Sequence, residues 1–317
     1  MGSFVAESSP SDAPAPALPP VGFLLLGSVS LLWGVNWPAM KMALAVFDPW
    51  TFRFACLLVG GATLLAVSLI GRKSLRVPQA DRIPMIVSTA LNVTGWQVFS
   101  SLGLTMMPAG RAAIIAFTMP LWASLLAALL LGERLTRARM AGLGLGLAGM
   151  ACLLVPDIAR IAAAPWGVLF MLAAAVSWAA GTVAIKRHRW RMDSVPLTGW
   201  QLLLGGVPVG IGVAVFGHPG DGFAHATAAS LWAALYAVSL PVSYSYWAWY
   251  RVVGLFPANV ASMGTLAIPV IGVLSSAVLL GETVGWPEIA ALILVLTALS
   301  LVLLVPAVQP GRESRQK

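Results

Sequence analysis

Ten long apolar segments occupy most of this sequence and restrict it to a membrane fold. The segments are residues 21–40, 49–70, 83–104, 108–131, 137–155, 165–186, 195–216, 228–250, 257–280 and 286–306. A transmembrane helix needs about 20 mostly apolar residues to cross a hydrocarbon core of about 30 Å. Only 9% of the residues are charged, which is too few to cover a water-soluble surface. The sequence therefore predicts an all-α polytopic membrane protein with ten transmembrane helices.

The flanking and connecting residues indicate the orientation of these helices. Residues 1–20 hold five prolines among Ser and Ala, and we interpret them as a disordered tail because this composition cannot bury a core. The tail has no Lys or Arg, so the first apolar segment is expected to be a retained span. If the N-terminus is cytoplasmic, 15 of the 19 Lys and Arg residues lie inside, several of them in the basic tail 307–317. The positive-inside rule therefore favours a cytoplasmic N-terminus and a cytoplasmic C-terminus.

The positive charge and the cysteines do not indicate other ligands. The net charge of +8 comes from cations that cluster between apolar segments, so nucleic acid is not an expected partner. Cys56 and Cys152 both lie inside apolar segments and are interpreted as small core residues. The histidines lie in connections without a Cys or carboxylate cluster at ligand spacing, so neither a metal nor a cofactor is expected.

An internal repeat divides the chain into two halves. Three landmarks of the segment PAGRAAIIAFTMPLWASLLAALLLGER return 149 residues later in PANVASMGTLAIPVIGVLSSAVLLGET. The pairs are Pro108 and Pro257, Pro120 and Pro269, and Glu133 and Glu282. Near the start of the halves, Trp33 precedes Lys41 by eight residues and Trp178 precedes Lys186 by eight. Each half holds five spans, an odd number, so the second half is expected to be inverted, with a substrate site between the halves near the midplane.

Several of these motifs resemble a known family. The WGVNWPAMK run of residues 33–41, the DPWTFRF run of 48–54 and the two blocks that end in LLGE at Glu133 and Glu282 are similar to the drug/metabolite transporter superfamily, EamA type. The resemblance implies two EamA repeats, residues 21–155 and 165–306, that carry small metabolites, often amino acids leaving the cell. The second repeat has Gly-Thr where the first has Asn-Trp at 36–37, so a shared site would be asymmetric.

Polar and aromatic side chains within the spans are the candidates for substrate contact. Polar groups are costly in hydrocarbon and tend to face a cavity, although an interhelical hydrogen bond is the alternative for each. A deep tryptophan needs a partner for its indole N–H or a wet cavity. Lys41, Arg53 and Arg111 either snorkel to the interface or recognise an anionic group such as a carboxylate. The predicted substrate-binding residues are Trp33, Asn36, Trp37, Lys41, Asn92, Trp96, Gln97, Arg111, Trp178, Trp200, Gln201, Tyr244, Trp247 and Asn259.

The prolines and acids of the spans bear on mechanism. Pro120 and Pro269 lie within apolar segments and are predicted to kink them, either for gating during alternating access or as ordinary packing kinks. The acids Asp48, Glu133, Asp157, Glu282 and Glu288 all fall at segment ends. We expect a helix-terminal structural role for Glu133 and Glu282. Without an acid at mid-span, the sequence favours transport driven by the substrate gradient, or exchange, over proton coupling.

The sequence thus predicts a secondary transporter of small metabolites in the bacterial inner membrane, exporting amino acids or related amphipathic metabolites by alternating access. A multidrug, toxic-compound, nucleoside or organic-acid permease of the same fold is the alternative. An intramembrane enzyme would need a nucleophile with a base, or paired carboxylates, within the spans, so the chain is not expected to be an enzyme. A non-transporting sensor is a more distant alternative. The expected partners are a small-molecule substrate and the lipid bilayer, with the chain a monomer or a weak homodimer.

Overall fold

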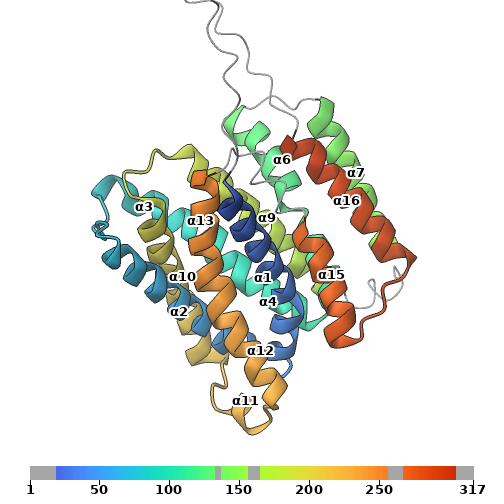
Figure 1. The fold of residues 1–317 in the computed structure, drawn as a ribbon, viewed down its shortest axis with the longest axis horizontal. Helices are drawn as coiled ribbons and strands as arrows, with labels where there is room; N and C mark the ends of the chain where they lie inside the picture. Colours follow the sequence, from blue (N-terminus) through green and yellow to red (C-terminus); the bar gives the residue numbers. More distant parts are fainter. Residues whose placement is uncertain (1–18, 133–136, 156–164, 256–266, 305–317) are drawn as a thin grey trace, which may run out of the picture.

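The computed structural model describes residues 19–132, 137–155, 165–255 and 267–304, and the regular elements within these ranges are helices. Figure 1 shows their arrangement. They are α1 (Pro20–Leu44), α2 (Pro49–Ile70), α3 (Gln79–Thr89), η1 (Ala90–Gly95), α4 (Trp96–Thr105), α5 (Ala109–Ala116), α6 (Met119–Leu131), α7 (Arg137–Leu154), α9 (Trp166–Arg187), α10 (Ser194–Phe216), α11 (Asp221–Ala224), α12 (Ala228–Ser239), η3 (Leu240–Tyr244), α13 (Ser245–Leu255), α15 (Ala267–Leu280) and α16 (Trp286–Leu304).

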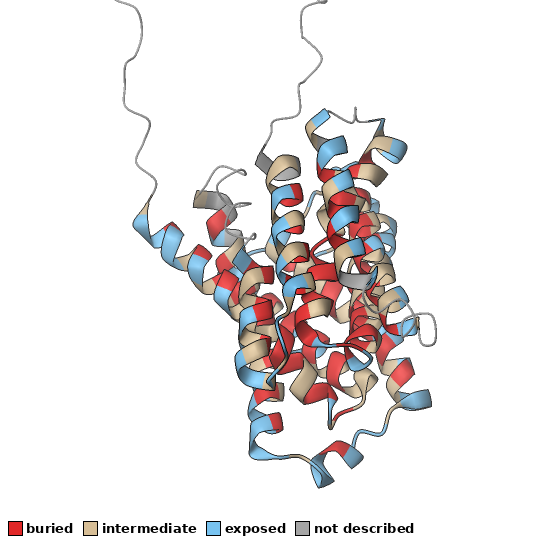
Figure 2. Cartoon of the chain, turned by 90° about the vertical axis from the view of Figure 1, so that its right-hand side faces the viewer, coloured by how far each residue is buried: buried red, intermediate tan, exposed pale blue. Residues whose placement is uncertain are grey.

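Length and apolar composition identify several of these helices as membrane helices. Five described stretches are long and apolar enough to cross a bilayer: Pro20–Leu44, Pro49–Ile70, Ala109–Leu131, Trp166–Arg187 and Ser194–Phe216. The outer surface carries large apolar side chains such as Ile70 and Val278, each 83% exposed. Figure 2 shows exposed residues along the outer faces of the helices and buried residues between them. Such a surface suits lipid better than water, and the predicted helical membrane class is confirmed.

Two of the expected segments contain π-helical turns. The third segment is the continuous run α3–η1–α4, and the eighth is α12–η3–α13. Ala90 begins η1 and Leu240 begins η3, so the two turns lie at corresponding places in the two halves. π-Helical turns inside α-helices often occur at functional sites. The sequence predicted both segments as spans but did not predict the π-helical turns within them.

The helices pair in a pattern that repeats between the halves. Helix α2 packs most extensively on its counterpart α10, and α7 packs on its counterpart α16. Helix α1 packs on α15, α12 and α13, and in the same way α9 packs on α6, η1 and α4. In Figure 1, α7 and α16 lie side by side at one end of the bundle. The first helix of each half therefore lies among helices of the other half.

Two glycines end corresponding helices in the same conformation. Gly132 follows α6 with a φ of 66°, and Gly281 follows α15 with a φ of 65°. A left-handed residue after a helix is favourable for glycine because it has no Cβ to clash. The LLGE motif thus ends a helix in both halves. Glu282, the last residue of the second LLGE motif, follows this turn and reaches the start of α5.

Candidate functional site

A cavity of about 630 Å³ lies between the two halves of the molecule. It is lined by α1, α2, η1, α4 and α6 of the first half and by α9, α12, η3, α13, α15 and α16 of the second. The structure brings eight of the predicted residues together around it: Trp33, Asn36, Trp37, Asn92, Trp96, Gln97, Pro120 and Trp178. Small-molecule sites typically enclose about 300–1,000 Å³ with mostly apolar walls and a few polar groups. The cavity has the size and position of a substrate site.

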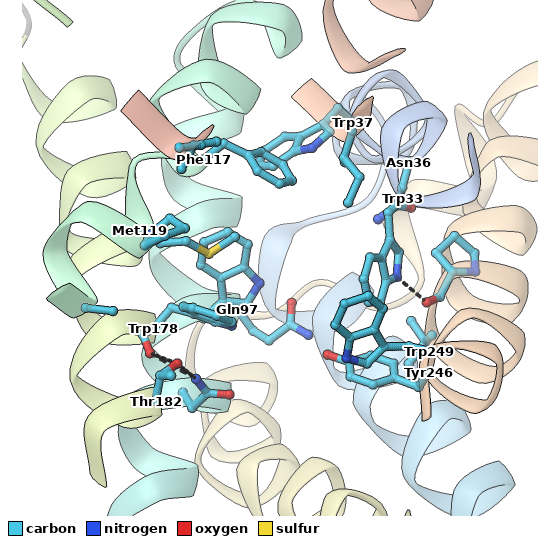
Figure 3. Close-up of a pocket in the computed structure, with 18 of the residues that line it drawn as sticks. Trp33, Asn36, Trp37, Gln97, Phe117, Met119, Trp178, Thr182, Tyr246 and Trp249 are labelled. Atoms are coloured by element: carbon cyan, nitrogen blue, oxygen red, sulfur yellow. Dashed lines mark hydrogen bonds between the residues drawn. The ribbon is translucent and has the colours of Figure 1, made fainter. Parts of the chain in front are cut away.

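Aromatic side chains form one wall of the cavity. The indole N–H of Trp33 donates to the carbonyl oxygen of Pro241 in η3, at 2.9 Å. The Trp33 ring centroid lies 5.8 Å from that of Tyr246 and 5.9 Å from that of Trp249. Figure 3 shows these three rings gathered on one side of the cavity, with Trp178 and Thr182 on the opposite side. A rigid aromatic wall of this kind offers apolar contact to a substrate at little cost in conformational entropy.

Asn92 joins the halves beside the cavity. Its amide nitrogen donates to the carbonyl oxygen of Trp178 at 3.0 Å and to the hydroxyl of Thr182 at 3.3 Å. A Cβ on Gly181 would lie 2.5 Å from the Asn92 backbone nitrogen, so the absence of a side chain there permits the contact of η1 with α9. This glycine occupies the place that Asn36 has in the first half. The amide nitrogen of Asn92 thus makes the interhelical hydrogen bond that was the alternative to substrate contact.

Three other polar atoms of the cavity lining have no hydrogen-bond partner. They are the side-chain oxygens of Asn36, Gln97 and Ser124, and each is buried. Gln97 is 9% exposed and Ser124 is 8% exposed. Buried polar groups nearly always have partners in folded proteins. Unpaired oxygens that gather in one cavity are therefore suited to receive donors from a ligand.

Arg53 is a cavity residue that the sequence did not place in the site. Its position near the start of α2 suggested the outer end of a span, but its side chain is buried and lines the cavity. It donates to the hydroxyls of Ser101 and Ser100 and to the sulfur of Met40, and it lies 5.4 Å from the centre of the Phe52 ring. The DPWTFRF motif was the signal for this residue. Only packing against α4 reveals that the guanidinium points inward.

Other lining residues were also absent from the predicted set. They are Met40, Phe117, Met119, Ser124, Thr182, Lys186, Tyr246 and Trp249, among others. Lys186 is followed by Arg187 and Arg189, and a basic cluster at the end of a span indicates orientation rather than a site. Tyr246 and Trp249 belong to a run with aromatics on every helix face, so the sequence could not show which of them face inward.

Two predicted cations lie away from the cavity. The ammonium of Lys41 donates to the carbonyl oxygens of Leu104, Thr105 and Met107, at 2.6, 3.2 and 2.9 Å, and so caps the end of α4. Arg111 forms an ion pair with Glu288, with 2.7 Å between Nη2 and Oε1. Neither residue is among those lining the cavity. Both connect helices that surround the cavity.

Four further predicted residues are not among those that line the cavity. Trp200 donates to the carbonyl oxygen of Leu75, and Gln201 donates to the hydroxyl of Ser88. Tyr244 shares a hydrogen bond with Ser28, and Trp247 is 37% exposed on the outer surface. Asn259 lies outside the described residues. For the first three, hydrogen bonding between segments far apart in the chain accounts for the polar group.

The two repeat prolines occupy helix starts in the described structure. Pro120 follows a two-residue break between α5 and α6 and lies in the first turn of α6. Pro269 lies in the first turn of the described part of α15, and the residues before 267 are outside the described ranges. A proline is compatible with the first turn of a helix, where its missing N–H costs nothing. The fourth segment is thus interrupted beside the cavity, since Phe117, Met119 and Pro120 line it.

Acidic groups support the fold around the site. Glu282 accepts hydrogen bonds from the backbone N–H groups of Ala109 at 2.6 Å and Gly110 at 2.9 Å, which cap the start of α5. Asp81 precedes the predicted third segment, lies in the first turn of α3 and is completely buried. It pairs with Nε2 of His188 at 2.8 Å and accepts the backbone N–H of Arg191. Glu133 lies outside the described residues.

The apolar helices and the shared cavity define a helical membrane transporter. Residues 20–155 and 165–304 each match the EamA-like transporter family, and the chain belongs to this family. The family transports rather than catalyses, so the chain is a transporter and not an enzyme. This confirms the resemblance that the sequence motifs indicated.

Relatives and a solved structure extend along nearly the whole chain. An uncharacterized transporter of Bacillus subtilis, YvbV, is 32% identical over 88% of this chain and 90% of its own. A Salmonella typhimurium protein named "Probable amino-acid metabolite efflux pump" is 26% identical over 88% of this chain and 93% of its own. A crystal structure with 24% identity aligns with a TM-score of 0.62 over 90% of this chain and 96% of that chain. The solved structure supports the fold.

Proposed function

We propose that this protein exports amino acids or related amphipathic metabolites by alternating access at the cavity between its halves. The observation that carries the proposal is that Trp33 and Trp178, which occupy matching repeat positions, line opposite sides of one cavity. Apolar aromatic walls suit the side chain of such a metabolite, and the polar oxygens suit its charged end. The name of the Salmonella relative supports the same substrate class.

The proposed topology has ten spans in two inverted repeats, residues 21–155 and 165–306, with both termini in the cytoplasm of a bacterial cell and the spans in its inner membrane. The clustering of Lys and Arg supports this orientation. The repeated helix pairing supports two equivalent halves. In alternating access, one half rocks against the other around the fixed site, and the broken fourth segment beside the cavity gives that motion a place to bend.

Counterflow in proteoliposomes tests the proposal. Purified protein is reconstituted, loaded with unlabelled amino acids and given a pool of labelled amino acids, with and without a pH gradient. We expect uptake by the wild type, at least tenfold slower uptake by the Trp33→Ala/Trp178→Ala variant, and little effect of the gradient. The matched control is Trp166→Ala/Trp286→Ala, because these tryptophans are 60% and 76% exposed on the outer surface. Absence of uptake of every amino acid by folded wild-type protein would contradict the proposed substrate class.

A further inference from the structure

Arg53 places a positive charge inside the cavity without a carboxylate beside it. Its side chain is 5% exposed, and it contacts two serine hydroxyls, a methionine sulfur, the sulfur of Cys56 and an aromatic ring. No described Asp or Glu lines the cavity. A buried charge without a counterion is strongly unfavourable unless another group compensates it. Among the described residues, this cation is therefore left without a carboxylate counterion.

We propose that Arg53 binds the carboxylate of the transported substrate and that Asn36 and Gln97 accept its ammonium group, so that the substrates are zwitterions. This inference rests on the proposed function, because it takes the cavity to be the transport site. It goes further by naming the anchoring residues and by excluding neutral and cationic amphiphiles as good substrates.

The surroundings of Arg53 hold its guanidinium in place and leave donors for a ligand. The hydroxyls of Ser100 and Ser101 donate to the carbonyl oxygen of Gln97, at 3.4 and 2.8 Å, so their lone pairs remain to accept from Arg53. A guanidinium has five N–H donors, and three take part in the bonds to Ser101, Ser100 and Met40. The sulfur of Cys56 is a further, weak acceptor beside the guanidinium, and a substrate carboxylate is a much stronger acceptor for the N–H groups of the two terminal nitrogens.

The unpaired oxygens of the cavity supply the complementary half of the site. The oxygens of Asn36 and Gln97 are buried without partners, and an ammonium group offers three N–H donors. Gln97 lies on α4, whose next turn carries the serines that hold Arg53. The same helix thus presents an acceptor for the amine and supports the donor for the carboxylate.

The charge of the lining also separates substrate classes. Arg53 lines the cavity, and its field attracts an anionic group and repels a cation. A cationic drug or an amino-acid amide with a free amine would enter a positive cavity with no group to bind Arg53. A zwitterion satisfies both ends of the site.

The test compares amino acids with their amides. Proteoliposome counterflow and quenching of tryptophan fluorescence are measured with the amino acids that the wild type transports and with the corresponding C-terminal amides, which keep the amine and the side chain. We expect the wild type to bind amides at least 100-fold more weakly than acids. Arg53→Gln should bind the acids at least 30-fold more weakly and should no longer discriminate between acid and amide. Arg53→Lys should recover part of that discrimination, because it restores the charge without the bidentate geometry.

The control is Arg76→Gln, which removes an exposed arginine of the loop between α2 and α3 and should leave discrimination unchanged. If Arg53→Gln does not fold, Ser100→Ala/Ser101→Ala replaces it, since loss of the serines should weaken acid binding while retaining the charge.

Wild-type protein that transports acids and amides equally would overturn this inference and leave the proposed function standing. Folded Arg53→Gln that keeps full discrimination would do the same, whereas no amino-acid transport at all would overturn both.

Discussion

The carboxylate of Glu288 at the start of α16 holds the guanidinium of Arg111 on α5, with 2.7 Å from Oε1 to both Nε and Nη2. Glu288 is 7% exposed in its side chain and Arg111 is 28% exposed. The carboxylate also accepts the backbone N–H of Gly285 at 2.9 Å. This pair therefore fastens the last helix of the second half to the broken fourth segment of the first.

Breaking this pair should destabilise the fold strongly. Removing one partner leaves the other charge largely buried and unpaired, which costs about 3 kcal/mol. We expect Arg111→Met and Glu288→Leu each to lower the melting temperature in detergent by several degrees, and the double variant Arg111→Met/Glu288→Leu to lower it less than Glu288→Leu alone. Thermal unfolding of the single and double variants measures this coupling. A double variant that loses the sum of the single losses would show that the two residues act independently.

Glu282 should stabilise the start of α5 through its two backbone hydrogen bonds. Glu282→Ala removes both acceptors for Ala109 and Gly110, and a lost helix cap typically costs about 1 kcal/mol. We expect a lower melting temperature for Glu282→Ala and a smaller decrease for Glu282→Gln, which keeps one acceptor. Equal melting temperatures for Glu282→Ala and the wild type would contradict the capping role. A lower melting temperature would assign Glu282 of the second LLGE motif a role in stability rather than in substrate binding.

Gly181 should be intolerant of any side chain. A Cβ there would lie 2.4 Å from the Asn92 Cβ and 2.5 Å from its backbone nitrogen, so the helices must separate, at a cost of about 1–3 kcal/mol. Gly181→Ala is expected to lower the melting temperature and to slow transport, because Asn92 and Trp178 line the cavity. Gly144→Ala is the matched control, since no atom lies within 4 Å of its Cβ. Similar behaviour of the two variants would contradict the close approach of η1 and α9.

Asp48 should make stability depend on pH at the acidic end. Partial burial alone would raise its pKa, but hydrogen bonds from the backbone N–H groups of Trp50, Thr51 and His218 outweigh burial and hold the pKa below its ordinary value. A lowered pKa in the folded state stabilises the protein above the unfolded value of about 3.9, and the contribution is lost as pH falls through the folded value.

Asp48→Ala should therefore lower stability by about 1 kcal/mol near neutral pH, and the difference from the wild type should shrink below about pH 4. Asp48→Asn keeps an acceptor for the start of α2 but cannot titrate, so its melting temperature should vary less with pH in that range. Melting temperatures of the three proteins between pH 3 and pH 7 provide the measurement. A difference that grows as pH falls would contradict this assignment.

The sequence predicted the class of fold because lipid imposes the same demand on every span. Apolar runs about 20 residues long need no tertiary information to be recognised. The repeat was equally visible in the sequence, because Pro269 follows Pro120 and Gly281 follows Gly132 at the same distance of 149 residues. Trp33 and Trp178 were identified as cavity residues by the same symmetry, and the structure places both there.

Helix rotation, by contrast, could not be predicted from an apolar sequence. In a soluble helix, the polar face indicates which side is exposed, but these helices are apolar all round, and the predicted substrate-binding residues included Tyr244 rather than Tyr246. Tyr246 lines the cavity, whereas Tyr244 bonds to Ser28. The π-helical turn that ends at Tyr244 changes the rotation of the helix that follows, and this turn has no simple sequence signal.

The sequence by itself determined that the chain is a helical membrane protein of two similar halves, since hydrophobic length and repeated landmarks are local properties. Only the tertiary structure decided which charges face the cavity. Arg53 and Arg111 both lie near the first turn of an apolar helix, yet Glu288 neutralises Arg111, while Arg53 contacts two serines and a methionine sulfur and has no described carboxylate beside it. That difference depends on contacts with residues that are 47 to 177 positions away in the chain. These contacts decide whether a buried charge joins two helices or remains available to a substrate.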